Sequence, residues 1–420
     1  MSICFAHGKT ADRRMEMKSR RGSSAIFLVF ILCGIFGVVF AFLAMARQIA
    51  QVAAVDSAMA LGGRSVLSEY DPCLKEHYGL FAFRGQQEDI NAKMKRYVHA
   101  TLSSHSWLGE VKITSDTSEY ALSNIDSFEE EILEYVRYAL AENLLKDKVD
   151  AAGGGEGQLL DTKESGRCIG NKGVAETLPS GGVVGSGDLF DRLRYFRDGS
   201  SALKKSSAGF LVNRYIMECF KNAQQQELAH DTFFKYEVEY ILCGHLDDDE
   251  NRKDVRRRLK LVRNGVALLY LYTDQKKMSQ LTTAAETLTP GPAAVVTQLA
   301  LAEAWALAEA ENDMRLLEHG YKVPLEKTDA TWAVELENIV KKKPEKFIPM
   351  DSERGFTYQG YLQMLLFLES RDRKYGRMMD LMQINIQGLW DSTFLMREHN
   401  TGFHVEGTVG GKKYRYDNEY

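Results

Sequence analysis

The chain has 420 residues, of which 45% are hydrophobic and 26% are charged, and its formal net charge is −5. This composition is typical of a globular protein long enough for two or more domains, and seven prolines exclude a proline-rich stalk. The negative charge argues against a general nucleic-acid binder, which needs a broad basic surface to displace counterions.

The first element is an uncharged, strongly apolar run at residues 25–45. As a helix it would span about 31 Å, which matches the roughly 30 Å hydrocarbon core of a bilayer. A buried core helix is rarely apolar on every face for six turns. The run therefore predicts one transmembrane helix, with the lipid bilayer as its partner.

The preceding segment, residues 1–24, carries six basic and two acidic side chains. Basic residues beside a first span stay in the cytoplasm. We therefore expect a single-pass protein of the cell membrane with a cytoplasmic N-terminus and an extracytoplasmic C-terminal domain. A signal peptide cleaved after Ala46 is the alternative, but its apolar core would be shorter, about 7–15 residues.

The helix is expected to continue as a stalk through residues 46–68, which contain no proline. Small residues recur along the span and the stalk at helical spacing, where another backbone could approach closely. The predicted packing positions are Cys33, Gly37, Ala41, Ala50, Ala54, Ala58 and Gly62. The alternative is that alanine simply favours helix.

Beyond the stalk we predict an α+β ectodomain of mixed helices and antiparallel strands, in two parts. The parts are residues 69–150 and 189–420, separated by a glycine-rich flexible insertion at 151–188, which buries too little apolar surface to offset its ordering entropy. In the first part, residues 111–122 alternate as in a strand. Residues 127–130 have the form of a capping box that opens an amphipathic helix.

The second part begins with helix-like residues 187–231, followed by an alternating segment, 235–242, that predicts a strand. The tail after Phe403 alternates around Gly410-Gly411 as in a terminal β-hairpin. The further predicted helices are 254–272, 293–317, 358–369 and 375–387.

The N-terminal residues KSRRGSSAIFLVFIL and AVDSAMALGGRSVLSEYD resemble the start of TadE/TadG-type proteins. These are pilin-like components of the tight-adherence (Flp) pilus, so the resemblance implies pilin-like or Tad-assembly membrane proteins as partners. It covers about the first 70 residues. Processed prepilins have a glutamate five residues after the cleaved glycine, whereas here Phe27 follows Gly22 at that distance. The anchor is therefore expected to be retained, and cleavage after Gly22 stays an alternative.

Two further stretches, SEYDPCLKEHYGLFAF and FKYEVEYILCGHLDDDENRKDVRRRLKLVRNGVALLYL, are similar to a family of uncharacterised surface proteins of Gram-positive bacteria. That family has the same kind of anchor and no assigned activity. This similarity spans most of the chain, and it implies a surface location without implying a reaction.

No catalytic, cofactor or metal site is predicted. The run 247–258 begins like a calcium loop but has arginine at both diagnostic positions. The Cys/His pairs at 73/77 and 243/245 offer two ligands each, whereas a structural zinc needs four. The glycine-rich run 182–188 lacks the Lys-Ser/Thr of a phosphate loop. We therefore do not expect an enzyme.

Basic side chains gather in residues 252–263, and Arg252, Arg256, Lys260 and Arg263 would lie close together on a helix. One interpretation is a solvated helix face that the acids at 247–254 neutralise. The other is a docking patch for an anionic cell-wall polymer or a partner protein.

Four cysteines follow the predicted span: Cys73, Cys168, Cys219 and Cys243. An exported location permits disulfides, but four cysteines allow three pairings and the sequence does not choose among them. Free thiols are the alternative.

Together these features predict a non-catalytic, membrane-anchored surface protein, an accessory or minor component of a Flp/Tad-type pilus or secretion assembly. One alternative is a tethered enzyme that acts on wall polymers through residues distant in sequence. The other is a sensor or adhesin that binds a ligand through the basic helix.

Overall fold

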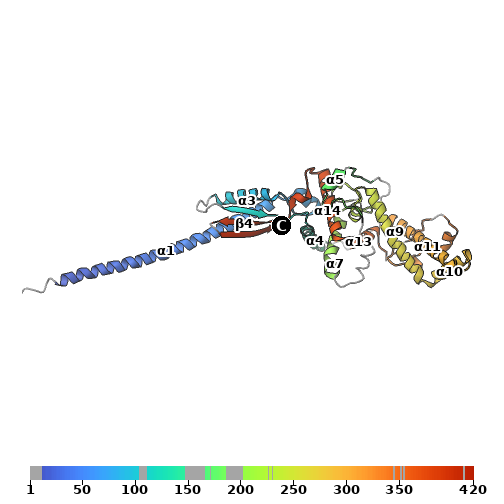
Figure 1. Ribbon diagram of the computed structural model, residues 1–420, viewed down its shortest axis with the longest axis horizontal. Coiled ribbons are helices and arrows are strands. Elements are labelled where there is room, and N and C mark those ends of the chain that lie inside the picture. Colours follow the sequence, from blue (N-terminus) through green and yellow to red (C-terminus); the bar gives the residue numbers. More distant parts are fainter. Residues whose placement is uncertain are drawn as a thin grey trace, which may run out of the picture. The chain divides into compact units, whose positions relative to one another are not determined.

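The fold belongs to the predicted α+β class and divides into two compact units (Figure 1). The computed structural model describes residues 12–103, 111–146, 166–170, 172–185, 202–225, 227–228, 230–343, 346–350, 352, 355–409 and 412–420. Unit 1 collects Met1–Ser68, Glu88–Ser115 and His404–Asn418. Unit 2 collects Glu69–Gln87, Asp116–Phe403 and Glu419–Tyr420. Each unit thus joins segments far apart in the sequence, unlike the predicted division into 69–150 and 189–420.

Unit 1 is built on α1 (Asp12–Leu67), one unbroken helix, as the absence of proline and turn signals predicts. Its most apolar 18-residue stretch has a mean hydropathy of 3.1, and the helix is long and apolar enough to cross a membrane. Residues 25–50 are exposed throughout, so no part of the described chain covers this apolar surface. Such a helix is consistent with membrane anchoring.

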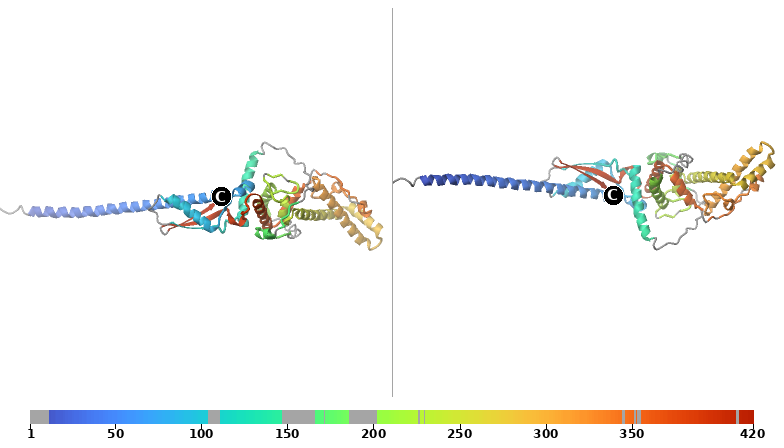
Figure 2. Two further views of the ribbon diagram at one scale, coloured as in Figure 1. Left: turned by 90° about the horizontal axis from the view of Figure 1, so that it is seen from above. Right: turned by 90° about the horizontal axis from the view of Figure 1, so that it is seen from below.

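The C-terminal part of α1 packs within unit 1 against α3 (Gln87–Leu102) and a three-stranded sheet (Figures 1 and 2). The strands are β2 (Lys112–Asp116), β4 (Gly402–Val409) and β5 (Lys412–Glu419), in the order β2-β4-β5. Ile90, Met94 and Val98 give α3 one buried face at helical spacing. The strand predicted within 111–122 is confirmed, and the tail forms strands at the predicted place.

The core of unit 2 surrounds α8 (Glu237–Cys243), a short helix whose seven residues are all buried. Helices α13 (Tyr358–Leu368) and α14 (Arg371–Leu389) contact α8 directly, and α2 (Pro72–Tyr78), α4 (Ile125–Lys146) and α7 (Ala202–Cys219) contribute to the same core. The smaller helices are α5 (Lys172–Thr177) and α12 (Leu336–Val340). Two short strands, β1 (Phe83–Arg84) and β3 (His399–Asn400), form an antiparallel pair.

Three long helices form a second core in unit 2: α9 (Asp248–Thr273), α10 (Gln275–Leu288) and α11 (Ala294–Glu318) (Figure 1). Two tryptophans, Trp305 and Trp332, lie in this core with ring centroids 5.1 Å apart. Asp247 caps α9, because its side chain accepts hydrogen bonds from the backbone N–H of Asp249 and Glu250. The acids at 247–250 therefore begin a helix, as predicted.

The strand predicted at 235–242 is wrong, because this segment contains α8. Alternation predicts a strand only if the intervening residues face solvent, and here Glu237 and Glu239 are buried as completely as their apolar neighbours. The predicted capping box is also wrong. α4 begins at Ile125, Asn124 accepts from the backbone N–H of Asp126, and Ser127 Oγ donates to the carbonyl of Glu119 instead.

Part of the glycine-rich segment 151–188 is held by specific contacts and does not behave as a free insertion. Cys168 forms an isolated bridge with Asp247, and the backbone N–H of Gly185 donates to the carbonyl of Cys243. Residues 151–165, 171 and 186–188 lie outside the described residues. The flexibility of the segment as a whole stays a prediction.

Candidate functional site

Four carboxylates with completely buried side chains lie on α8 or beside it: Glu237, Glu239, Asp248 and Asp380. A buried carboxylate needs hydrogen-bond donors or a cation to compensate its lost hydration. Because clusters of perturbed carboxylates are common at active sites, the partners of each one decide what this cluster does.

The two glutamates of α8 bind neighbouring backbone and neutral side chains. Glu237 accepts from the backbone N–H of Lys221 at 2.9 Å and from the side-chain amide of Asn385 at 2.7 Å. Glu239 accepts from the backbone N–H of Ala223 at 3.0 Å and from the hydroxyl of Tyr358 at 2.9 Å. Burial raises the pKa of Glu237 to about 8 and that of Glu239 to about 7. Both groups thus titrate near neutral pH.

The two aspartates fasten loops to the core in the same way. Asp248 accepts from the backbone N–H groups of Arg167 and Lys235 at 2.8 and 3.0 Å. Asp380 accepts from the backbone N–H of Ser180 at 2.9 Å and from the hydroxyl of Tyr240 at 3.0 Å. Burial raises the pKa of both carboxyls.

Arg377 on α14 also binds backbone groups, but as a hydrogen-bond donor. Its guanidinium donates to the carbonyls of Ile241, Leu242, Val183 and Gly185 at 2.7–3.1 Å. Most partners of these buried groups are therefore backbone groups of irregular segments. We interpret the cluster as the scaffold that positions the described residues within 166–185 and 221–236, because each of the five side chains forms at least two hydrogen bonds with the fold itself.

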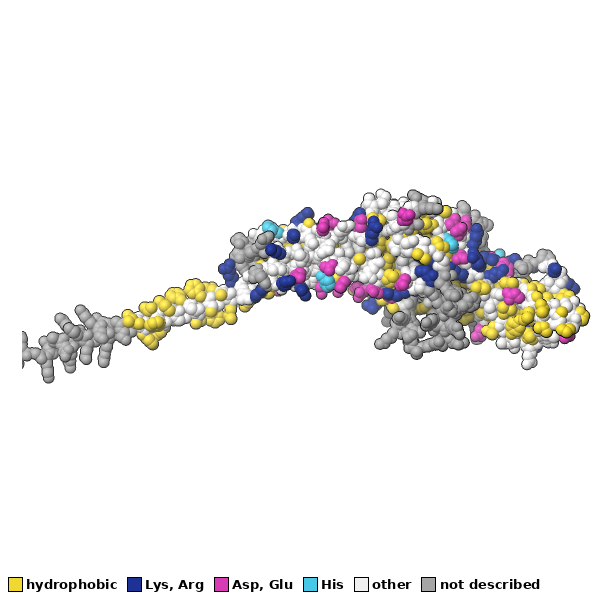
Figure 3. Space-filling model, viewed as in Figure 1, with side chains coloured by type: hydrophobic (Ala, Val, Ile, Leu, Met, Phe, Trp, Pro, Cys, Tyr) yellow, Lys and Arg dark blue, Asp and Glu magenta, His cyan; other side chains and the backbone are white. Residues whose placement is uncertain are grey.

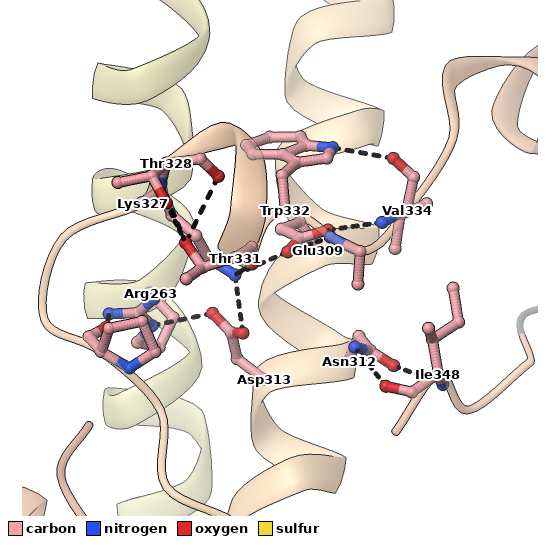
Figure 4. A network of polar contacts seen from close by, with 12 residues as sticks. Arg263, Glu309, Asn312, Asp313, Lys327, Thr328, Thr331, Trp332, Val334 and Ile348 are labelled. Carbon is pink, nitrogen blue, oxygen red and sulfur yellow. Dashed lines mark hydrogen bonds and ion pairs between the residues drawn. The ribbon is translucent and has the colours of Figure 1, made fainter. Parts of the chain in front are cut away.

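A second buried network joins α9, α11 and the loop that follows α11 (Figure 4). Arg263 Nε donates to Asp313 at 2.8 Å, and Lys327 Nζ donates to Asp313 at 2.8 Å and to Glu309 at 2.5 Å. All four side chains are at most 1% exposed, so two cations and two anions balance one another inside the protein.

The network extends to the backbone of the loop. Glu309 accepts from the backbone N–H groups of Ala333 and Val334, and the indole of Trp332 donates to the carbonyl of Val334 (Figure 4). The indole of Trp305 donates to the same carbonyl. These contacts fix residues 327–334 against α11. They give the three-helix region a rigid polar centre beside its tryptophan core.

The predicted docking patch of Arg252, Arg256, Lys260 and Arg263 does not form one accessible surface. Arg263 is completely buried in the network, because α11 covers that side of α9. The other three are half-buried, and Arg256 and Lys260 lie 2.6 and 2.9 Å from Glu311. Binding of a partner by these three residues stays a prediction.

The predicted small-residue stripe divides into two parts. Ala58 and Gly62 are buried within unit 1, where a Cβ added to Gly62 would lie 3.2 Å from Val98. Ala54 is half-buried. Ala50 and the three membrane positions Cys33, Gly37 and Ala41 are exposed. The stalk end of the stripe thus packs against the chain's own α3.

The described cysteines, Cys33, Cys73, Cys168, Cys219 and Cys243, are all free. Burial raises the pKa of Cys219 to about 12 and also raises that of Cys243, so both thiols stay protonated at neutral pH. Among the described residues there is no group of three or more His, Cys, Asp or Glu side chains that could hold a metal ion.

Hydrophobic side chains gather on the surface of the three-helix region (Figure 3). The large exposed ones are Leu269 and Tyr272 of α9, Leu288 of α10, and Val295, Val296 and Leu299 of α11. Single exposed apolar residues are ordinary, but a gathering of this kind is typical of contact surfaces.

Residues 164–411, well over half of the chain, match the model of a family described as a family of unknown function, DUF5702. No curated protein and no solved structure matches the chain. The match begins after the apolar helix, so the resemblance of the N-terminus to TadE/TadG-type proteins stays a prediction.

Proposed function

The chain belongs to the family of unknown function DUF5702, and we propose that it is a single-pass membrane protein whose two folded units lie outside the cell and act in binding and assembly, without catalysis. The observation that carries this proposal is α1, whose apolar N-terminal half is exposed while its C-terminal half packs inside unit 1. Exposed apolar surface of that length is costly in water and favourable in lipid.

The orientation rests on the charge of residues 1–24, which have six basic and two acidic side chains. The strongest charge bias beside a single span stays cytoplasmic, so both units would face the exterior. The proposal also fits the buried carboxylates around α8, which are engaged by the fold.

The orientation can be measured with two variants that each keep one cysteine, the others being replaced by alanine. One keeps Cys168, which is exposed in unit 2, and the other keeps Cys4 in the basic segment. A membrane-impermeant maleimide should label the Cys168 variant on intact cells and the Cys4 variant only after permeabilisation. The reverse pattern would refute the orientation, and loss of Cys4 labelling under both conditions would show a cleaved N-terminus.

Within this role we propose that the chain is an accessory component of a Flp/Tad-type pilus or secretion assembly. The TadE/TadG-like N-terminus supports this proposal, as do the exposed membrane positions Cys33, Gly37 and Ala41 and the apolar surface of the three-helix region. Small residues at helical spacing let two membrane helices approach closely.

The assembly role predicts that Gly37→Leu weakens association, since a larger side chain would separate α1 from the membrane helix of its partner. Co-purification of other membrane proteins with the tagged chain in mild detergent should fall. Val39→Phe, about 200° around the helix, is the matched control and should leave co-purification unchanged. If the unsubstituted chain and the Val39→Phe variant both purified without other membrane proteins, the assembly role would be contradicted. A tethered wall-polymer enzyme stays the alternative, and turnover of such a polymer by the purified chain would establish it.

A further inference from the structure

Unit 1 contains a groove of about 490 Å³ between α1 and the strands β4 and β5. The part of α1 that lines it is one helix face, because the lining positions recur at intervals of three and four residues. These positions are Phe40, Leu43, Ala44, Arg47, Gln48, Gln51 and Val52. The opposite wall is formed by Val409 of β4 and by Lys412 and Tyr414 of β5.

The chemistry of this helix face changes along its length. Phe40 and Leu43 lie in the uncharged run 25–45 and are 68% and 59% exposed. At 1.5 Å per residue, the polar positions from Arg47 to Gln51 lie about 3–9 Å beyond the end of that run. The polar layer of a bilayer is roughly 5–8 Å thick on each side of the hydrocarbon core. With α1 across the membrane, one end of the groove is therefore at the depth of the acyl chains and the other at the depth of the headgroups.

Positive charge gathers at the polar end of the groove. Residues 46–55 of α1 contain one basic and no acidic side chain, and residues 409–416 contain three basic and no acidic side chains. Gly410 and Gly411 stand between the two strands in the sequence and have no side chain that could alter this balance. Both segments that line the groove at this end are therefore basic.

The alternation of β5 separates its cations. Lys413 and Arg415 face Glu406, at 2.7 and 3.7 Å. Lys412 and Tyr414 lie on the other face of the strand and line the groove. Lys412 is exposed and has no ion-pair partner among the described residues. It therefore brings an uncompensated positive charge to the groove.

Tyr414 adds a hydrogen-bond donor that the described chain does not use. Its hydroxyl is buried and has no hydrogen-bond partner among the described residues. The first acid of α1 after the apolar run, Asp56, accepts from Tyr416 instead. A buried hydroxyl without an acceptor is unfavourable, so a ligand oxygen that reached it would be bound favourably.

We propose that this groove binds an anionic phospholipid, with the phosphate beside Lys412 and the acyl chains along Phe40 and Leu43. A phospholipid joins a charged phosphate to apolar chains, as the groove joins a basic end to an apolar end. Arg47 adds a guanidinium at the headgroup level, and guanidinium groups form paired hydrogen bonds with phosphate oxygens. This inference rests on the proposed membrane span, and the proposed orientation assigns the lipid to the outer leaflet.

The test is native mass spectrometry of the full-length protein in neutral detergent. Phosphatidylglycerol and phosphatidylcholine with the same acyl chains are added at equal concentration, because both have a phosphate but only the first has a net negative charge. We expect the first bound lipid to be phosphatidylglycerol, preferred at least about fivefold, the effect of one basic side chain at an anionic surface. Lys412→Gln should remove most of this preference. Lys413→Gln makes the same charge change on the face toward Glu406, so it should alter the preference less than about twofold.

Four results would overturn the proposal. Phosphatidylcholine could bind equally well, Lys413→Gln could lower the preference as much as Lys412→Gln, or glycerol 3-phosphate, which has no acyl chains, could displace the lipid. A dimer that excluded phosphatidylglycerol would assign the groove to a second copy of the chain. The comparisons of lipids need no variant, so they test the groove even if Lys412→Gln failed to fold.

An alkaline carbonate wash of membranes that contain the chain tests the span separately. Retention of the chain in the membranes, together with the expected lipid preference, would support both the span and the groove. Retention without that preference would overturn the groove and leave the span in place. Release of the chain into the wash would overturn the span and, with it, the lipid assignment.

Discussion

Lys327→Met is the sharpest test of the buried ionic network. The substitution removes a cation that is 1% exposed and keeps a side chain of similar length. Glu309 would lose its only ion-pair partner among the described residues but keep the backbone N–H groups of Ala333 and Val334, and Asp313 would keep Arg263. Removing one partner of a buried ion pair costs about 3–5 kcal/mol. Because these other donors stay, we expect the lower end, about 3 kcal/mol of unfolding free energy.

The measurement is urea unfolding of the full-length protein, followed by tryptophan fluorescence, since Trp305 and Trp332 lie beside the network. In thermal unfolding, a loss of about 3 kcal/mol would lower Tm by roughly 5 °C for a unit of about 300 residues. The double variant Lys327→Met/Glu309→Gln removes both charges of one pair. It should recover part of the loss, with a coupling of about 1–3 kcal/mol between the two sites.

Lys276→Met is the control, because Lys276 is 82% exposed and lies 3.8 Å from Asp329. A surface pair of this kind contributes about 0–1 kcal/mol. Two results would contradict a stabilising network. In one, Lys327→Met would lower the unfolding free energy no more than Lys276→Met does. In the other, the double variant would lose more unfolding free energy than its two single variants together.

Two further changes test the buried carboxylates and the stalk. The pKa of Glu237 is about 8 in the folded protein against 4.5 in the unfolded chain, so the folded state alone holds the proton between these values and stability should fall as pH rises through this window. Glu237→Gln should flatten that decline in urea unfolding, whereas exposed Glu286→Gln should not, and an unchanged pH profile would contradict the assignment. Gly62→Leu should destabilise unit 1 by about 1–3 kcal/mol through overpacking against Val98. Gly37→Leu should leave thermal unfolding unchanged, since nothing lies within 4 Å of an added Cβ there. If the two leucine variants changed thermal unfolding equally, the packing of Gly62 against α3 would be contradicted.

Long elements with a clear period could be predicted from the sequence. The apolar run at 25–45 lies within α1, and the segments predicted at 254–272 and 293–317 are α9 and α11. In α9 and α11 the signal is local, because side chains three or four apart share a face whatever the tertiary structure, and in the apolar run it is the length of the uncharged stretch. Segment 235–242 could not be predicted in this way, because α8 is buried on every side and its alternation of apolar and acidic residues does not mark a solvent-facing side.

The candidate site was harder to predict, since it depends on which helix covers which face. Spacing places Arg263 near Arg256 on α9, but only the packing of α11 shows that Arg263 is buried. The buried network brings Lys327 of the following loop to Glu309 and Asp313 of α11 through the same packing.

The three-segment construction of unit 1 has a consequence for how the protein is made. Its sheet includes β4 and β5, which are synthesised after all but the last residues of unit 2. Until those strands are synthesised, the face of α1 that includes Met59 stays only partly covered. A chain that ended before residue 404 would therefore contain the whole of α1 and nearly all of unit 2, but its three-stranded sheet would lack two strands.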